Sequence, residues 1–188
     1  MWSALVTGGT GFLGRAVVAR LKEEGWDVGL LTHSSVDLRN QTAVQRAFRN
    51  LKQGFTVLIH LACTEGGGGI GYARAHPGSL LYDTLMMNTL VMEEARKFGV
   101  GLFLGIGSVC SYPRDAPIPT REEDLWNGYP EETNGYYGIA KKVMALQTEA
   151  YYQEYGMRGA HLILANLYGP GDKYKEGSTV GHVIPATI

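Results

Sequence analysis

The stretch Ser3-Ala4-Leu5-Val6-Thr7-Gly8-Gly9-Thr10-Gly11-Phe12-Leu13-Gly14 decides the fold. A short apolar run leads into glycines at positions 8, 11 and 14, and an amphipathic segment follows. At a strand-to-helix turn, such glycines allow the tight bend, the approach of a pyrophosphate to the backbone, and close packing of helix on strand. The helix N-terminus then offers free N–H groups and the positive end of its dipole to phosphates. The pattern predicts a dinucleotide site; the alternative is a glycine-rich turn that holds no ligand.

Short apolar runs alternate with longer amphipathic stretches along the rest of the chain. We expect strands at 3–7, 27–32, 56–61, 101–106 and 159–165, and helices at 11–24, 42–51, 79–98 and 135–155. Strands that alternate with helices of this length form parallel β-α-β units. We therefore predict an α/β fold, a Rossmann-type doubly wound parallel sheet. Two long loops, 65–77 with four consecutive glycines and 111–134 with four prolines, are of the kind that often carries function.

The composition is that of an ordinary globular domain. The 188 residues are 45% apolar and 19% charged, with a formal net charge of −1, so there is no basic field to hold a nucleic acid. No apolar run is long enough to cross a bilayer, and we see no signal peptide, so no membrane association is expected. The two cysteines, Cys63 and Cys110, lack metal-ligand spacing. We expect no metal and a reducing, cytoplasmic setting.

A tyrosine–lysine pair stands in the last predicted helix. Tyr137 and Lys141 are four residues apart, so they share a helix face. A nearby ammonium favours the tyrosinate, so we expect a lowered phenol pKa and a better proton shuttle. Lys141 would also reach the hydroxyls of a nicotinamide ribose. Tyr136 is the competing tyrosine, but its spacing of five residues fits one helix face less well; a surface pair without function is the other alternative.

The end of the second predicted strand bears on the choice between the two nicotinamide dinucleotides. An acid there would bind the ribose 2′-hydroxyl. The segment Leu31-Thr32-His33-Ser34 holds no carboxylate, and Asp27 begins the strand instead of ending it. This absence favours NADP(H) over NAD(H), with Arg39 or Arg15 as the partner of a 2′-phosphate.

Taken together, these residues resemble the extended short-chain dehydrogenase/reductases, a family of sugar-nucleotide epimerases, dehydratases and reductases. Further matching segments are Leu61-Ala62, 103–113, Thr133-Asn134, 149–156, 166–172 and 181–186. Within the family, they are most similar to the GDP-L-fucose synthase branch, which epimerises and reduces a GDP-linked 4-keto-6-deoxy sugar. The resemblance implies a dinucleotide-binding domain over residues 1–170 and the start of a substrate-binding lobe over 171–188, cut short at Ile188. It also implies a homodimer formed through two long helices.

The resemblance assigns roles to individual residues. Cys110 and His182 would be the base and acid that invert carbons next to a ketone. Tyr137 would protonate the C4 oxygen, with Ser108 as its hydrogen-bond partner and Lys141 as the tuning charge. Besides Tyr137 and Lys141, the implied cofactor contacts are Gly8, Gly11, Phe12, Leu13, Gly14, Asp37, Leu38, Leu61, Ala62, Asn166 and Leu167.

Some positions receive no role, and two alternatives to the main prediction stay open. We interpret Cys63 as a core residue. Thr84 stands where the family carries an asparagine, and Asn88 lies one turn further on, so that role is not transferred. The first alternative is another sugar-nucleotide enzyme: a 4-epimerase, a 4,6-dehydratase or a 4-ketoreductase that needs neither Cys110 nor His182. The second is a non-catalytic module that only binds NAD(P).

Overall fold

The computed structural model describes residues 2–51, 54–64 and 69–172, and within them it confirms the predicted parallel sheet. Five parallel strands lie in the order β2-β1-β3-β4-β5. They are β1 (Ser3–Thr7), β2 (Asp27–Leu31), β3 (Val57–His60), β4 (Leu102–Ile106) and β5 (Gly159–Leu162). The helices are α1 (Phe12–Glu23), α2 (Gln41–Arg49), α3 (Gly69–Ala75), α4 (Pro77–Phe98) and α5 (Gly135–Tyr155), with short 3₁₀ helices η1 (Val109–Ser111) and η2 (Glu122–Trp126).

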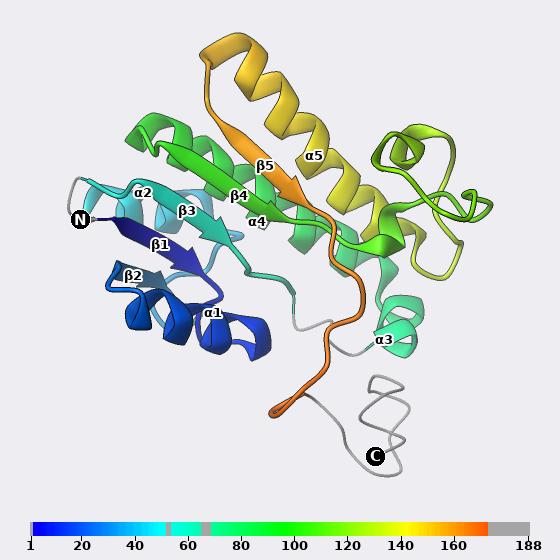
Figure 1. The fold of residues 1–188 in the computed structure, drawn as a ribbon, viewed down its shortest axis with the longest axis horizontal. Helices are drawn as coiled ribbons and strands as arrows, with labels where there is room; N and C mark the ends of the chain where they lie inside the picture. Colours follow the sequence, from blue (N-terminus) through cyan, green and yellow to red (C-terminus); the bar gives the residue numbers. More distant parts are fainter. Residues whose placement is uncertain (1, 52–53, 65–68, 173–188) are drawn as a thin grey trace.

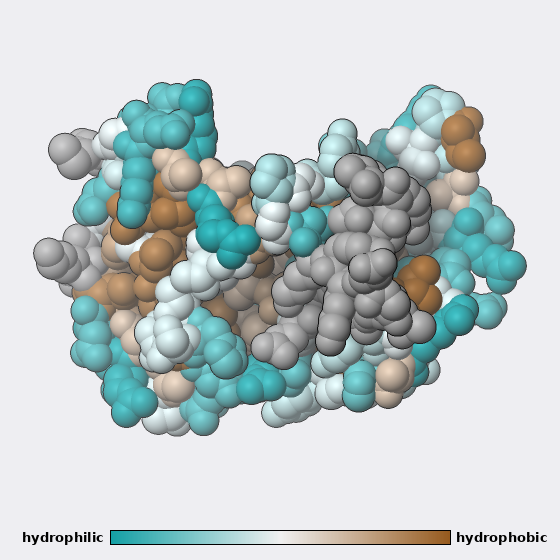
Figure 2. All heavy atoms as spheres, turned by 90° about the horizontal axis from the view of Figure 1, so that it is seen from below, coloured by the Kyte–Doolittle hydropathy of each residue, from teal (hydrophilic) through white to brown (hydrophobic). Residues whose placement is uncertain are grey.

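Helices cover both faces of the sheet, as expected of a doubly wound fold (Figure 1). On one face, Val18 of α1 packs against Ala4, Val6, Val57 and Ile59 of β1 and β3. On the other, a larger core joins α2, α4 and α5 to the strands, with Phe48, Met92, Phe103 and Met144 among its buried members. Seen from below, apolar side chains also reach the surface on the left, the side of α1 and β2, among hydrophilic ones (Figure 2).

The observed elements differ from the predicted ones mainly in the loops and at element ends. The loop 65–77 contains α3, and the loop 111–134 contains η1 and η2. Helix α4 begins at Pro77, two residues before the predicted start, because proline lacks the N–H that the first helical turn does not use. Strand β5 ends at Leu162 instead of residue 165. In the described part of the chain, no helix is long and apolar enough to span a membrane.

Candidate active site

The turn between β1 and α1 has the tight geometry that its glycines predict. Gly8 has a φ of +69°, and a Cβ there would lie 2.7 Å from the backbone nitrogen of Ala62. A Cβ on Gly14 would collide with the carbonyl oxygen of Gly8, so the start of α1 packs directly on the turn. No side chain caps α1 at Gly11. The N–H groups of its first turn are therefore free to bind an anionic ligand such as a pyrophosphate.

A cavity of about 650 Å³ lies beside this turn, a volume within the usual range for ligand sites. Eight of the predicted cofactor residues line it: Gly8, Gly11, Phe12, Leu13, Asp37, Leu38, Leu61 and Ala62. They come from the turn after β1, the first turn of α1, and the segments that follow β2 and β3, at the carboxyl edge where open α/β sheets bind their ligands. Gly14 does not line the cavity, because it lies against the turn itself.

Charged side chains stand at the cavity's end after β2. Arg39 binds Asp37, with 2.9 Å between Nε and Oδ1, and Asp83, with 3.2 Å between Nη1 and Oδ2. Hydrogen bonds from Arg39 hold the pKa of Asp37 down at about 2, so this carboxylate stays ionised. Arg15 lies beside the glycine turn and donates to the carbonyl of Thr10 at 3.1 Å. Of the two arginines predicted to meet a 2′-phosphate, Arg39 lines the cavity, and it forms ion pairs with Asp37 and Asp83.

Tyr137, in the first turn of α5, lies close to both cysteine side chains. Burial raises the pKa of the Tyr137 hydroxyl, and interaction with the Cys63 thiol and then with Cys110 raises it further. The lowered pKa predicted from the Tyr–Lys spacing is therefore wrong. Lys141 Nζ lies 5.7 Å from the centre of the Tyr137 ring and donates to the Ile106 carbonyl at 2.8 Å. Burial lowers the pKa of this ammonium group.

Cys63 is the residue that sequence reasoning missed. It is exposed, not part of the core as predicted, and it lines the cavity next to Ala62. Its position three residues after the last residue of β3 is the signal that identifies it, because side chains at the carboxyl ends of parallel strands meet at the ligand-binding edge.

Ser108 and Cys110 lie at the carboxyl end of β4, as predicted. The Ser108 hydroxyl caps η1 by accepting the Cys110 N–H at 3.2 Å. Helix α5 packs tightly on η1. Only a glycine fits at position 138, since a Cβ there would collide with the Cys110 carbonyl oxygen. This packing brings Tyr137 next to the half-buried Cys110. Tyr137, Lys141, Ser108, Cys110 and Cys63 thus form one group of side chains, the side-chain cluster.

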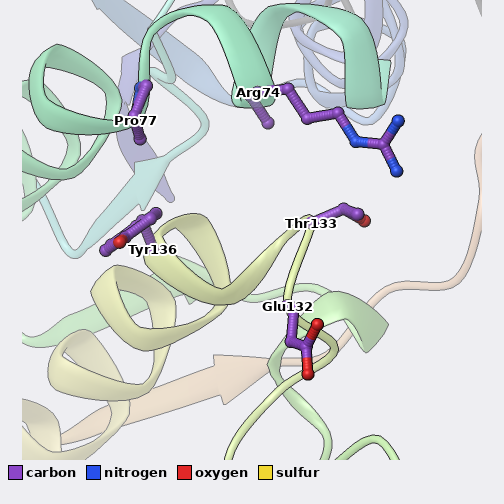
Figure 3. Close-up of a pocket in the computed structure, with 6 residues that line it drawn as sticks. Arg74, Pro77, Glu132, Thr133 and Tyr136 are labelled. Atoms are coloured by element: carbon purple, nitrogen blue, oxygen red, sulfur yellow. The ribbon is translucent and has the colours of Figure 1, made fainter.

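The competing tyrosine faces a different space. Tyr136 is half exposed and lines a separate pocket of about 250 Å³. The other residues of that pocket come from α3, the start of α4 and the segment before α5: Ala73, Arg74, Pro77, Glu132 and Thr133 (Figure 3). Tyr137, not Tyr136, therefore belongs to the cluster beside the dinucleotide cavity.

A buried hydrogen-bonded chain supports the cavity from below. The Thr7 hydroxyl accepts the Ala62 N–H at 3.2 Å, which leaves its own proton for His60 Nδ1 at 2.7 Å. His60 Nε2 then donates to Asn88 Oδ1 on α4 at 3.0 Å. Complete burial lowers the pKa of His60 to about 3, so the ring is neutral and its tautomer is fixed. These hydrogen bonds join the end of β1 to the end of β3 and to α4, next to the glycine turn.

Two of the predicted cofactor residues, Asn166 and Leu167, are not brought to the cavity. They are exposed in the segment after β5. His182 and residues 173–188 of the predicted substrate lobe lie outside the described residues. Thr84, at the family's asparagine position, is fully buried and donates to the Leu80 carbonyl at 2.7 Å, a bond within its own helix.

Comparisons with known proteins agree with this geometry. The GDP-L-fucose synthase of Sinorhizobium fredii is 35% identical over 183 residues, 97% of this chain and 56% of that protein. A Campylobacter jejuni GDP-6-OMe-4-keto-L-xylo-heptose reductase superposes with a TM-score of 0.88 at 29% identity, over 98% of this chain and 51% of that one. A Naegleria fowleri GDP-L-fucose synthetase bound to NADP gives 0.86 at 29% identity, over 98% and 59%.

The chain thus spans little more than half the length of the relatives it matches. The family model described as the NAD dependent epimerase/dehydratase family matches residues 4–188, which is nearly the whole sequence. The chain belongs to the NAD dependent epimerase/dehydratase family.

Proposed function

We propose that the protein is an NADP(H)-dependent epimerase/reductase of a nucleotide-linked 4-keto-6-deoxy sugar, with a GDP-linked sugar as the favoured substrate. One observation carries the proposal: the side-chain cluster adjoins the cavity of the glycine turn, because Cys63 belongs to both. A proton donor therefore stands next to the space where a dinucleotide fits. The similarity to GDP-L-fucose synthases and to a GDP-sugar reductase supports the choice of substrate class.

The residues present fit a phosphorylated dinucleotide. Gly8, Gly11 and the first turn of α1 would hold the pyrophosphate, since the turn is too tight for a Cβ on Gly8, which would lie 2.7 Å from the Ala62 nitrogen, and the first helical turn offers free N–H groups. Arg39 would meet a 2′-phosphate, with a charge-assisted hydrogen bond as the attraction. Lys141 would hold the nicotinamide ribose. When bound, the cofactor supplies the hydride that reduces the C4 ketone.

The side-chain cluster would then perform the acid–base chemistry. Tyr137 gives its proton to the C4 oxygen, and its raised pKa keeps the hydroxyl protonated until that oxygen becomes basic. Ser108, at the end of β4, would hydrogen-bond the same oxygen. Cys110 would take the acidic proton from a carbon next to the ketone, and His182 would return a proton on the opposite face.

Turnover of a GDP-sugar tests the proposal. The purified protein is mixed with NADPH and GDP-4-keto-6-deoxymannose, and NADPH absorbance is followed while the product is analysed by NMR. We expect NADPH consumption and an epimerised, reduced sugar. NADPH binding without consumption would contradict the proposal and support a non-catalytic NAD(P)-binding module.

A simple 4-ketoreductase is the second candidate, and the likeness to the C. jejuni heptose reductase favours it. The two functions differ in their need for Cys110. In an epimerase/reductase, Cys110→Ser should abolish exchange of solvent deuterium into the sugar next to the ketone. In a ketoreductase, wild type and Cys110→Ser should both reduce the sugar, without such exchange.

We also propose a homodimer formed through α4 and α5. Apolar side chains on both helices stand in solvent: Tyr82 is 59%, Val143 37% and Leu146 54% exposed. Large exposed apolar groups on neighbouring helices suit a partner surface. Light scattering should give twice the chain mass for wild type and the single mass for Leu146→Glu.

Two further proposals concern location and domain division. The free thiols of Cys63 and Cys110 suit a reducing compartment, so we propose a cytoplasmic location, to be tested by cell fractionation. We also propose that residues 1–170 form the dinucleotide-binding domain and 171–188 begin a substrate-binding lobe. Limited proteolysis should then cut near residue 170 first.

A further inference from the structure

We propose that Asp83 sets the balance between the two nicotinamide dinucleotides: it competes with a 2′-phosphate for Arg39, so that the cavity accepts NADH as well as NADPH. This role deepens the proposed function and rests on its dinucleotide cavity. The charges concerned lie at the end of the cavity after β2, where Asp37, Arg39 and Asp83 all line the wall. Arg39 and Asp83 are 44 positions apart in the sequence and meet because Asp83 lies on α4.

The guanidinium of Arg39 is already engaged by carboxylates on both of its hydrogen-bonding edges. Its Nε and Nη2 donate to the two oxygens of Asp37 at 2.9 and 3.0 Å, a bidentate pair that takes one edge. The other edge is formed by Nη1 and Nη2, and Nη1 donates to Asp83 Oδ2 at 3.2 Å. An arginine binds a phosphate best through two parallel N–H groups, so a 2′-phosphate must displace Asp83 to gain this second edge.

The charge balance among these three side chains also opposes a phosphate. Two carboxylates pair with one guanidinium, which leaves a net negative charge. The side chain of Asp83 is 19% exposed, against 48% for Asp37, so solvent screens the Asp83 charge less. A phosphate that approaches Arg39 is therefore repelled by Asp83, whereas an uncharged ribose hydroxyl is not.

The same carboxylates suit the dinucleotide that lacks the phosphate. In Rossmann domains, an acid beyond the second strand accepts the ribose 2′-hydroxyl of NAD(H), and an arginine nearby accommodates the 2′-phosphate of NADP(H). Residues 31–34, at the end of β2, include no acid, which in the sequence favours NADP(H). The structure brings acids from Asp37 and from Asp83 of α4, so acceptors for a hydroxyl and a donor for a phosphate stand at one place.

Binding of both dinucleotides to the cofactor-free protein tests the proposal without any sugar. The Kd of NADPH and the Kd of NADH are measured by titration calorimetry at pH 8, where histidine side chains carry no charge. In wild type, we expect the two constants to differ by less than about thirtyfold, which corresponds to about 2 kcal/mol. A larger preference for NADPH would overturn the proposal, because the carboxylates would not support binding of the unphosphorylated ribose.

Substitutions at both partners test the competition itself. Asp83→Asn should tighten NADPH binding by about fivefold, the size expected of one partly exposed charge, and change the Kd of NADH by less than about twofold. Asp83→Glu keeps the charge and should retain the wild-type ratio of the two constants. Arg39→Gln should weaken NADPH binding at least about tenfold, because a charge-assisted hydrogen bond to the phosphate is lost. An unchanged ratio in Asp83→Asn, or an equal loss of both affinities, would overturn the proposal, since Asp83 would then only fix α4 to the segment after β2.

Glu94→Gln is the matched control for Asp83→Asn. It removes one negative charge from the same helix, about three turns further on, where Glu94 pairs with Lys97 at 2.8 Å and is not among the described residues that line the cavity. Both dissociation constants of this variant should match wild type.

The outcomes separate the role of Asp83 from the proposed function. A protein that binds both dinucleotides with these ratios but never oxidises NADPH in the presence of the GDP-sugar would overturn the epimerase/reductase assignment, while the role of Asp83 stands. Turnover of the sugar with an unchanged ratio in Asp83→Asn would do the reverse. A protein that binds neither dinucleotide would overturn both.

Discussion

The glycine turn and the side-chain cluster meet at one cavity but depend on different properties of the chain. The turn, residues 7–14, is built from backbone, and it requires that atoms be absent at Gly8 and Gly14. The cluster is built from side chains of three separate segments, and it requires particular acidic and basic groups. A substitution that adds a side chain at the turn should therefore weaken cofactor binding. A substitution that removes a functional group from the cluster should instead lower the turnover rate.

The largest effect is expected from Tyr137→Phe, which removes one oxygen from the cluster. Loss of a positioned proton donor costs about 10²- to 10⁴-fold in rate. We therefore expect kcat for NADPH oxidation to fall by about that factor. The Kd of NADPH, measured by fluorescence, should stay within about threefold, because the turn is untouched. A Kd that rose by the same factor as kcat fell would contradict the view that the cluster and the turn act separately.

The second prediction adds one methyl group at the turn. In Gly8→Ala, the Cβ would lie 2.7 Å from the Ala62 nitrogen, at a φ of +69°. We expect the Kd of NADPH to rise at least about tenfold, because the turn must move away from the pyrophosphate. The free energy of unfolding should also fall by about 1–3 kcal/mol from crowding.

Gly25→Ala is the matched control for this substitution. Gly25 has nearly the same backbone conformation, with a φ of +77°, but no atom lies within 4 Å of a Cβ placed there. We expect about 1 kcal/mol of destabilisation from the positive φ and no change in NADPH affinity. Equal affinity losses in the two variants would mean that the close contact with Ala62 is not what shapes the turn.

The two regions also differ in how far the sequence predicts them. The turn is local: three glycines between a strand and a helix specify its shape, and the structure confirms it. The cluster is not local, since Cys63 and Tyr137 are 74 positions apart and meet only because β3 ends and α5 begins at the same edge of the sheet. The spacing of the two residues predicted that Lys141 has the main influence on the pKa of Tyr137. In the structure, burial of the hydroxyl is the largest cause of the pKa shift, and burial is not visible in the spacing.

The third prediction concerns His60, which connects the two regions through the buried chain to Thr7 and Asn88. In His60→Phe, the hydroxyl and the amide lose their partner, and an unsatisfied buried polar group costs about 1–3 kcal/mol. Urea unfolding at neutral pH should show this loss. NADPH affinity should fall modestly, by about threefold, because the chain steadies the turn from below.

The same residue gives a pH dependence with a definite sign. The pKa of His60 is about 3 in the folded protein, below the 6.5 of a free histidine. The unfolded chain therefore binds more protons between these values, and stability falls as pH drops from 6.5 towards 3, by at most about 1.4 kcal/mol per pH unit. Urea titrations at pH 7.5, 5.5 and 4.5 should show a flatter profile for His60→Phe. Parallel profiles would mean that His60 charges as easily in the folded state.

The smallest effect is expected far from the cavity, at the far ends of α4 and α5. Glu93 on α4 accepts hydrogen bonds from Arg96 at 2.8 Å and from the Tyr151 hydroxyl of α5 at 3.0 Å. The hydrogen bond from Arg96 is the main cause that holds the pKa of Glu93 down at about 2. The ionised carboxylate therefore contributes stability above pH 4.5, and this contribution is lost as pH falls towards 2.

Glu93→Gln should lower the free energy of unfolding at pH 7 by about 0.5–1 kcal/mol, the size expected of a partly exposed ion pair. Because this contact joins α4 to α5 without reaching either region, NADPH affinity and kcat should both match wild type. Because α5 also carries Tyr137, this variant tests whether a change elsewhere on the same helix affects the cluster. A fall in kcat with unchanged affinity would show that the cluster depends on how α5 is held along its whole length, and that its geometry is less local to the cavity than the contacts of Tyr137 indicate.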